Sequence, residues 1–273
     1  MELPNRDEHE AAIATALATV AQRHRHEIEE LMGDVPDMDH VPEEFWQRME
    51  DETAEAIQDS LLDTFSASSH LHGWGHRKTE KKALREVRQG ISDAALAAYG
   101  WATDRARAFA RYWTTSTRER IRVGIENPAE PPPIDVTQAE HEQASRTPRA
   151  ITSGEFNVLL DATFSPQRIE TVAIDEVTRA RHAGAETARD ATVGLGGNDR
   201  WRTQRDDRVC HICEPNEGTR RDDWPAKFAE GPPCHPRCRC WIEYQDLEAD
   251  QYGSEWTIPL ASEWTIPLPE HLR

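Results

Sequence analysis

Apolar side chains recur every three or four positions over the first half of the chain, a spacing typical of amphipathic α-helices. The first helix is expected to begin near Asp7, which forms a capping-box pattern with Glu10, and to end at Gly33. A second apolar stripe ends near Phe65, before residues 66–75, whose Ser, His and Gly content predicts a loop. The N-terminal region is therefore predicted to be helical.

The longest helical pattern runs from about residue 78 to residue 125, with Gly90 and Gly100 as positions where the helix could bend or divide. Residues 127–135 (NPAEPPPID) end it, because consecutive prolines favour an extended polyproline II conformation. A further helix is expected to start at Ser165 and Pro166, which suit the N-cap and N1 positions.

Short strand-like segments and turns are expected after this last helix. The predicted fold class is α+β and predominantly α-helical, with long N-terminal helices and a small C-terminal module that contains short β-strands. The predicted organisation is a helical domain at residues 1–126, a proline-rich connecting segment at 127–164, a Cys/His module domain at 165–246 and a tail at 247–273. The tail repeats the heptapeptide SEWTIPL, and Trp256 and Trp264, one in each copy, are candidate anchors for a partner.

All five cysteines lie in the string CHICEPNEGTRRDDWPAKFAEGPPCHPRCRC. A Cys-x-x-Cys pair followed by His-x-x-Cys-x-Cys has the spacing of a structural zinc site, because each turn can direct two soft donors at one point. Such an ion would stabilise a segment that has too few apolar side chains to fold alone. The candidate Zn²⁺ ligands are Cys210, Cys213, His235, Cys238 and Cys240.

Which four of these donors bind the ion is left open by the sequence. The first choice is Cys210, Cys213, His235 and Cys238; Cys240 could replace one of them, and Cys234 is expected to be a spare thiol. Disulfide bonds or free, packed cysteines are the alternative interpretations, although an odd count leaves one thiol unpaired in any disulfide scheme. More than four available donors favour a closed structural site over a catalytic one, which needs an open coordination position.

Three features in a row carry a resemblance to a known family: Trp201, then VCHIC at residues 209–213, then PPCHPRCRC at residues 232–240. With the helix before them, they resemble the phage Mu F-like minor head proteins, also called phage head morphogenesis proteins. Glu176 and Arg179 match the family pattern on that helix, whereas Asp175 stands where the family usually has Thr. The resemblance covers residues 165–244 and implies structural roles for Glu176, Arg179 and Trp201.

The resemblance also implies a virion protein of low copy number, structural and not an enzyme, that associates with the portal protein and the major capsid protein. It would be located in the head interior or at the portal vertex, in the host cytoplasm during assembly, and it could touch packaged DNA. No membrane partner is expected, since no apolar run approaches the length of a bilayer span.

Acidic residues outnumber basic ones by 50 to 32, which gives a formal net charge of −18. Such a surface repels itself at low ionic strength and is largely screened in molar salt. Together with the resemblance, this composition predicts a tailed virus of a halophilic host; an ordinary acidic protein from a GC-rich genome is the alternative.

The alternative function is a zinc-module nucleic-acid-binding protein, or a nuclease, that acts on packaged viral DNA. Its candidate phosphate contacts are the arginines of the long helix: Arg105, Arg107, Arg111, Arg118, Arg120 and Arg122. A DNA-binding module should present a basic face that outweighs its acidic residues. No phosphate-binding glycine loop, nucleophile elbow or His-Glu-x-x-His motif is present in the sequence, so no catalytic residues are predicted.

Overall fold

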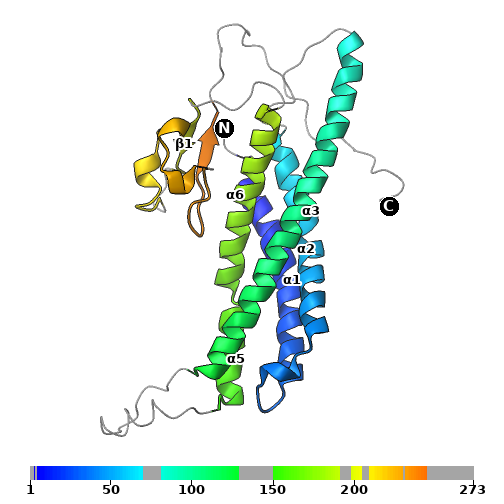
Figure 1. Ribbon diagram of the computed structural model, residues 1–273, viewed down its shortest axis with the longest axis vertical. Coiled ribbons are helices and arrows are strands. Elements are labelled where there is room, and N and C mark those ends of the chain that lie inside the picture. Colours follow the sequence, from blue (N-terminus) through cyan, green and yellow to red (C-terminus); the bar gives the residue numbers. More distant parts are fainter. Residues whose placement is uncertain are drawn as a thin grey trace.

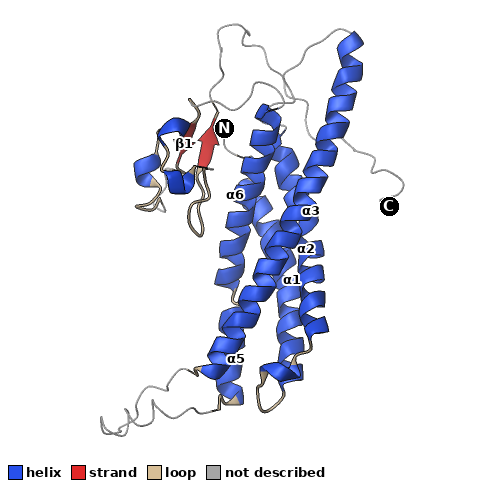
Figure 2. Cartoon of the chain, in the orientation of Figure 1, coloured by secondary structure: helices blue, strands red, loops and turns tan. Residues whose placement is uncertain are grey.

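The computed structural model describes residues 3, 5–69, 81–128, 150–190, 198–204, 209–229 and 231–244, without the side chains of residues 81–94 and 190. Long helices dominate this part of the chain and pack side by side (Figure 1). They are α1 (Arg6–Met32), α2 (Glu43–Ser69), α3 (Lys81–Glu126), α5 (Ser153–Thr163) and α6 (Pro166–Asp190). Within the described residues, the strands lie in a small module beside α6 (Figure 2). The prediction of a mostly helical chain with a small sheet is confirmed.

One hydrophobic core joins these helices. It takes buried side chains from every helix of the bundle, among them Leu17, Phe45, Trp113, Leu160 and Val177. Residues on both sides of the proline-rich segment therefore share one core. The predicted division of the chain into residue ranges stays a prediction. Among the described helices, none combines the length and apolar composition that a membrane crossing requires.

The predicted ends of two helices are found, but one predicted cap is wrong. α1 ends before Gly33, whose positive φ of 61° suits a residue without a side chain. α6 begins at Pro166, as the Ser165–Pro166 pair predicts. The capping box of Asp7 and Glu10 does not form, because α1 starts at Arg6 and its N-cap residue is Asn5, two residues before Asp7. Glu10 instead pairs with the buried guanidinium of Arg6 at 2.6 Å.

The predicted loop at residues 66–75 begins too early, because α2 continues to Ser69. Its last serines are buried against α6: Ser68 Oγ donates to the Arg181 carbonyl at 2.7 Å and Ser69 Oγ donates to the Gly184 carbonyl at 3.0 Å. Tertiary hydrogen bonds thus extend a helix through residues that by composition favour a loop. The rest of this loop lies outside the described residues.

α3 is continuous over 46 residues, so Gly90 and Gly100 do not divide it. α5 falls inside the segment that was predicted to be a connection. A capping box of Thr152 and Glu155 begins it, and the Leu159 side chain fills the space above Gly124 of α3. The S/T-x-x-E signal was present in the sequence, next to the proline-rich run.

The module is built from very short elements. Strands β1 (Arg200–Arg202) and β2 (Trp241–Glu243) pair antiparallel, with Trp201 opposite Ile242. Three single-turn 3₁₀ helices, η3 (Glu214–Asn216), η4 (Arg221–Asp223) and η5 (Ala226–Phe228), lie between them in the sequence. The buried members of its hydrophobic core are Trp201, Cys213, Trp224, Cys238, Cys240 and Ile242. Half of this small core is cysteine, so apolar burial alone gives it little stability.

Candidate metal centre

Two turns of the module face each other and supply the cysteine and histidine donors. In the first turn, the amide of Cys213 donates to the Cys210 carbonyl at 3.0 Å. In the second turn, the amide of Cys238 donates to the His235 carbonyl at 3.2 Å. Each turn reverses the chain within four residues and so brings its two donor side chains to one side. The aromatic ring of Trp201, fully buried, packs in the same small core.

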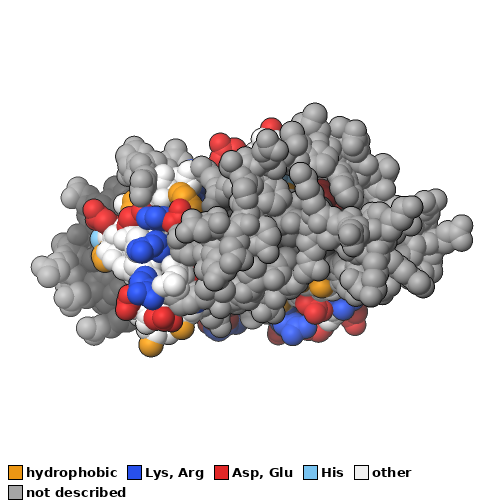
Figure 3. All heavy atoms as spheres, turned by 90° about the horizontal axis from the view of Figure 1, so that it is seen from above, with side chains coloured by type: hydrophobic (Ala, Val, Ile, Leu, Met, Phe, Trp, Pro, Cys, Tyr) orange, Lys and Arg blue, Asp and Glu red, His pale blue; other side chains and the backbone are white. Residues whose placement is uncertain are grey.

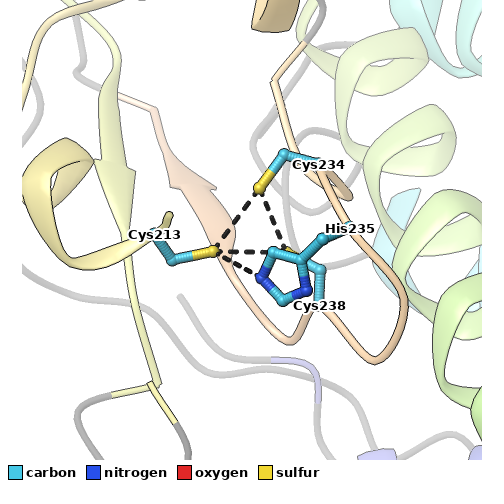
Figure 4. A group of neighbouring side chains, drawn as sticks. All are labelled: Cys213, Cys234, His235 and Cys238. Atoms are coloured by element: carbon cyan, nitrogen blue, oxygen red, sulfur yellow. Dashed lines mark hydrogen bonds between the residues drawn. The ribbon is translucent and has the colours of Figure 1, made fainter. Parts of the chain in front are cut away.

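The side chains of the two turns point toward one another (Figure 4). Cys213 Sγ lies 2.9 Å from His235 Nε2, 3.5 Å from Cys234 Sγ and 3.8 Å from Cys238 Sγ. Cys234 Sγ and Cys238 Sγ are 4.0 Å apart. These four donor atoms all lie within 4.8 Å of one another, so they could hold a metal ion. Cys210 Sγ lies 2.9 Å from the same His235 nitrogen.

The separations between the sulfur atoms fit a thiophilic ion with tetrahedral coordination. With metal–sulfur bonds of about 2.3 Å, the sulfurs of a tetrahedral site stand about 3.8 Å apart, close to the separations of 3.5–4.0 Å found here. His235 also has a suitable orientation: its Nδ1 is 2.8 Å from the Pro236 carbonyl oxygen. A proton on Nδ1 satisfies this carbonyl and leaves the Nε2 lone pair for an ion.

The electrostatics of the cluster also suit a cation. All five cysteines are free thiols. Hydrogen bonds from the Cys213, Cys234 and Cys240 thiols lower the pKa of Cys238, which concentrates thiolate character on a fully buried sulfur. A thiolate is the form that binds a metal, and a buried negative charge is costly without a positive partner. The cluster therefore favours a soft divalent cation, whose identity the donor set leaves open.

Of the five predicted ligands, Cys213, His235 and Cys238 belong to the group of mutually close donors. Cys210 lies beside His235, and Cys240 is buried in the same small core and lines the cavity next to the donor atoms. Which of them bind the ion stays a prediction. Cys234 does not stand apart as expected: it is one of the four mutually close donors. Its position directly before His235 was the available signal, because neighbouring residues of a turn can both face inward.

A cavity of ≈ 400 Å³ adjoins the donor atoms. Cys210, Cys213, His235 and Cys240 line it together with Arg237. Two donors that are less close to the rest, Cys210 and Cys240, thus lie on its wall.

Of the helix residues that match the family pattern, Glu176 makes its shortest contacts to another helix. Glu176 is 3% exposed and accepts two hydrogen bonds from Arg105 of α3, at 2.6 and 2.5 Å. Arg179, three residues along α6, is exposed, and its Nε is 3.8 Å from Glu176. Glu176 therefore fixes α6 against α3, a contact between distant parts of the chain that spacing in the sequence does not reveal. Asp175 lies beside the module, and burial raises its pKa to about 6.

Comparison with known families gives one finding. Residues 139–243 match the family model described as Phage Mu protein F like protein. The match covers less than half of the 273 residues, includes α5 and α6, and ends in β2 after every cysteine of the chain. It indicates a protein of phage head morphogenesis. No curated protein and no solved structure matches the chain.

The match starts upstream of Ser165, where the resemblance in the sequence begins, so it also includes part of the predicted connecting segment. The candidate anchors Trp256 and Trp264 lie outside the described residues, as does the whole predicted tail.

Proposed function

We propose that this chain is a minor head protein of a tailed virus and that it acts structurally, at the portal vertex or in the capsid interior, in contact with the portal and major capsid proteins. The family match over residues 139–243 carries the proposal. In this proposal the protein is not an enzyme. The ion of the C-terminal module is Zn²⁺, which has no redox chemistry and accepts four thiolate or imidazole ligands in a closed site.

The number of donors supports a structural ion. Five sulfurs and one imidazole surround the site, so four ligands are available without water. A catalytic zinc keeps a water or substrate position that such a donor set would fill. The ion would hold together the two turns and, through them, the pairing of β1 with β2.

The charges around the module and on α3 support the structural role over the DNA-binding alternative. On β1, Arg202 contacts both Glu217 and Glu243, and on η4, Arg221 contacts both Glu186 and Asp199. Basic side chains also lie among acidic ones on the described part of the face in Figure 3. Carboxylates that already neutralise guanidinium groups leave less positive charge for phosphates.

Four of the six arginines proposed as phosphate contacts are likewise paired within the protein. Their partners are Glu176 for Arg105, Glu50 for Arg111, Glu43 for Arg118, and Glu119 and Glu126 for Arg122. Several of these pairs join α3 to α2 or α6, so the arginines stabilise the bundle. A halophilic host is part of the same proposal, supported by the formal charge of −18.

The proposal is tested on purified virus particles. Gel densitometry of this chain against the major capsid protein should give few copies per particle, as expected for a protein at one vertex. Hundreds of copies would contradict the portal position. Metal analysis of the purified chain should find about one zinc per chain, and a chain without metal would remove the structural zinc from the proposal.

A further inference from the structure

α6 has a polar face directed at the module, in addition to the apolar face that packs in the bundle. Asp175, Thr178, His182 and Glu186 recur every three or four residues and so share one side of the helix. Each contacts the module, and Thr178 also accepts a hydrogen bond from Arg6 of α1. Glu186 contacts the module through an ion pair with Arg221, at 2.9 Å.

Three of these side chains hold the main chain of the turn that carries His235 and Cys238. Asp175 Oδ1 accepts a hydrogen bond from the Arg237 amide at 2.7 Å, and Thr178 Oγ1 donates to the Cys238 carbonyl at 2.7 Å. His182 Nε2 is 3.4 Å from the Cys240 carbonyl oxygen. Because these contacts go to backbone atoms, they set the conformation of the turn rather than recognise its side chains.

The turn needs such support at Arg237. Its φ is +63°, in the left-handed region that residues with a side chain seldom adopt. The amide of this same residue is the one held by Asp175. A sparsely populated backbone conformation persists when its surroundings fix it. Arg237 thus lies in a strained turn that the Asp175 carboxylate holds, between the two candidate metal donors His235 and Cys238.

α1 joins the same contact from the other end of the chain. Arg6, the first residue of α1, is 4% exposed. Its guanidinium donates to Thr178 Oγ1 at 2.6 Å and to the Arg239 carbonyl at 3.2 Å, while Glu10 balances its charge. Main-chain groups of four consecutive residues, 237–240, are therefore held by side chains of α6 and α1.

We propose that Asp175, Thr178 and Arg6 are positioning residues of the metal centre, so that binding of the ion and docking of the module on the bundle are coupled. The proposal rests on the proposed metal site. Contacts with the bundle hold the turn in the conformation that brings the metal donors together. The bound ion stabilises the same conformation, in which the turn can contact the bundle. Such coupling is reciprocal: weakening the contact to the bundle weakens metal binding, and removing the ion loosens the contact.

Thr178→Val tests the coupling, with Thr171→Val as its matched control. In both threonines of α6 the hydroxyl lies within hydrogen-bond distance of the carbonyl four residues earlier, but of the two, Thr178 alone also reaches the turn, where the Cys238 carbonyl is the nearer acceptor. We expect Thr178→Val to weaken Zn²⁺ binding about 10-fold, the lower end of the effect of losing an outer support of a metal ligand. Competition with a chromophoric chelator measures this affinity in the full-length chain. Thr178→Ser, which keeps the hydroxyl, should restore it, and Thr171→Val should leave it unchanged.

Equal zinc affinity in Thr178→Val and Thr171→Val would overturn the coupling while leaving the metal site intact. Absence of zinc binding in the unaltered chain would instead overturn the proposed metal site. Hydrogen exchange of the unaltered chain, which needs no variant, gives the second measurement. Chelation should speed exchange in residues 235–243 and in the first two turns of α1, and leave the middle of α2 and α3 protected. Unchanged exchange at the start of α1 would exclude the role of Arg6.

Discussion

The bundle and the module are held together by different physics. In the bundle, long helices bury large apolar side chains such as Trp113, Phe45 and Leu17 against one another. In the module, two three-residue strands and single-turn helices surround a core that is half cysteine. The bundle's stability is distributed over many contacts. The module has few apolar contacts of its own, and hydrogen bonds and an ion pair attach it to α6.

This difference predicts opposite responses to removal of the ion, which is the largest expected effect. Cys213→Ser removes the sulfur that lies closest to the other donors. We expect the module to lose its fixed structure and Trp201 and Trp224 to become exposed to water, because structural zinc supplies about 10 kcal/mol or more in small metal domains. Tryptophan fluorescence and near-ultraviolet circular dichroism report this loss, while helicity at 222 nm should persist. Chelator treatment of the unaltered chain should produce the same state.

Two outcomes would contradict the comparison. If Cys213→Ser leaves the tryptophan spectra unchanged, the module does not depend on its donors. If helicity collapses together with the module, the bundle is not an independent source of stability.

A substitution at the tightest helix contact should have the converse effect on the bundle. A Cβ atom at Gly184 of α6 would lie 2.3 Å from the Phe65 carbonyl oxygen of α2, a backbone atom that cannot move without shifting the helix. We expect Gly184→Ala to lower the free energy of unfolding of the bundle by about 1–3 kcal/mol, as overpacking does. Urea unfolding followed at 222 nm measures it.

Gly100→Ala is the control, because a Cβ atom at Gly100 of α3 meets nothing within 4 Å. There, alanine should stabilise the helix by about 0.5–1 kcal/mol through the lost flexibility of glycine. Equal effects of the two substitutions would show that α2 and α6 can separate at no cost, contrary to the close contact described.

The same contrast explains which features could be predicted from the sequence. Helix periodicity and end signals are local, so the end of α1 at Gly33 and the start of α6 at Pro166 were predictable. The spacing of cysteine and histidine is also local chemistry, and three of the donors it selects, Cys213, His235 and Cys238, lie close together. What failed depends on distant contacts. Arg105 faces Glu176 across 71 residues, and no pattern in the sequence pairs them.

Asp175 shows how a departure from a family pattern can carry information. In the sequence, Asp175 stands where the family pattern usually has Thr, and no role was assigned to it. In the structure its carboxylate accepts a hydrogen bond from the amide of Arg237, at the strained position of the turn that carries the candidate metal donors His235 and Cys238. The left-handed conformation of a non-glycine residue is invisible in the sequence, and so is the partner that holds it. The capping box at Asp7 failed for a related reason, because Arg6 is buried against the module and begins the helix earlier.

The smallest expected effect is a pH dependence of the bundle's stability that arises at a buried polar contact. His24 of α1 is fully buried, its Nε2 is 2.7 Å from a Glu52 oxygen of α2, and burial lowers its pKa. As the pH falls below about 6.5, His24 takes up a proton in the unfolded chain but not in the folded one. The free energy of unfolding should therefore fall with pH, by at most about 1.4 kcal/mol per pH unit from this group.

His24→Gln keeps a donor for Glu52 and removes this proton uptake. The unaltered chain should lose more stability between pH 7 and pH 5 than the variant, in urea unfolding followed at 222 nm. Other titrating groups are common to both chains, so the difference isolates His24. His26→Gln, at an exposed position two residues away, should behave like the unaltered chain. If His24→Gln shows the same loss as the unaltered chain, the buried imidazole takes up its proton without unfolding, and the pH response of the bundle arises elsewhere.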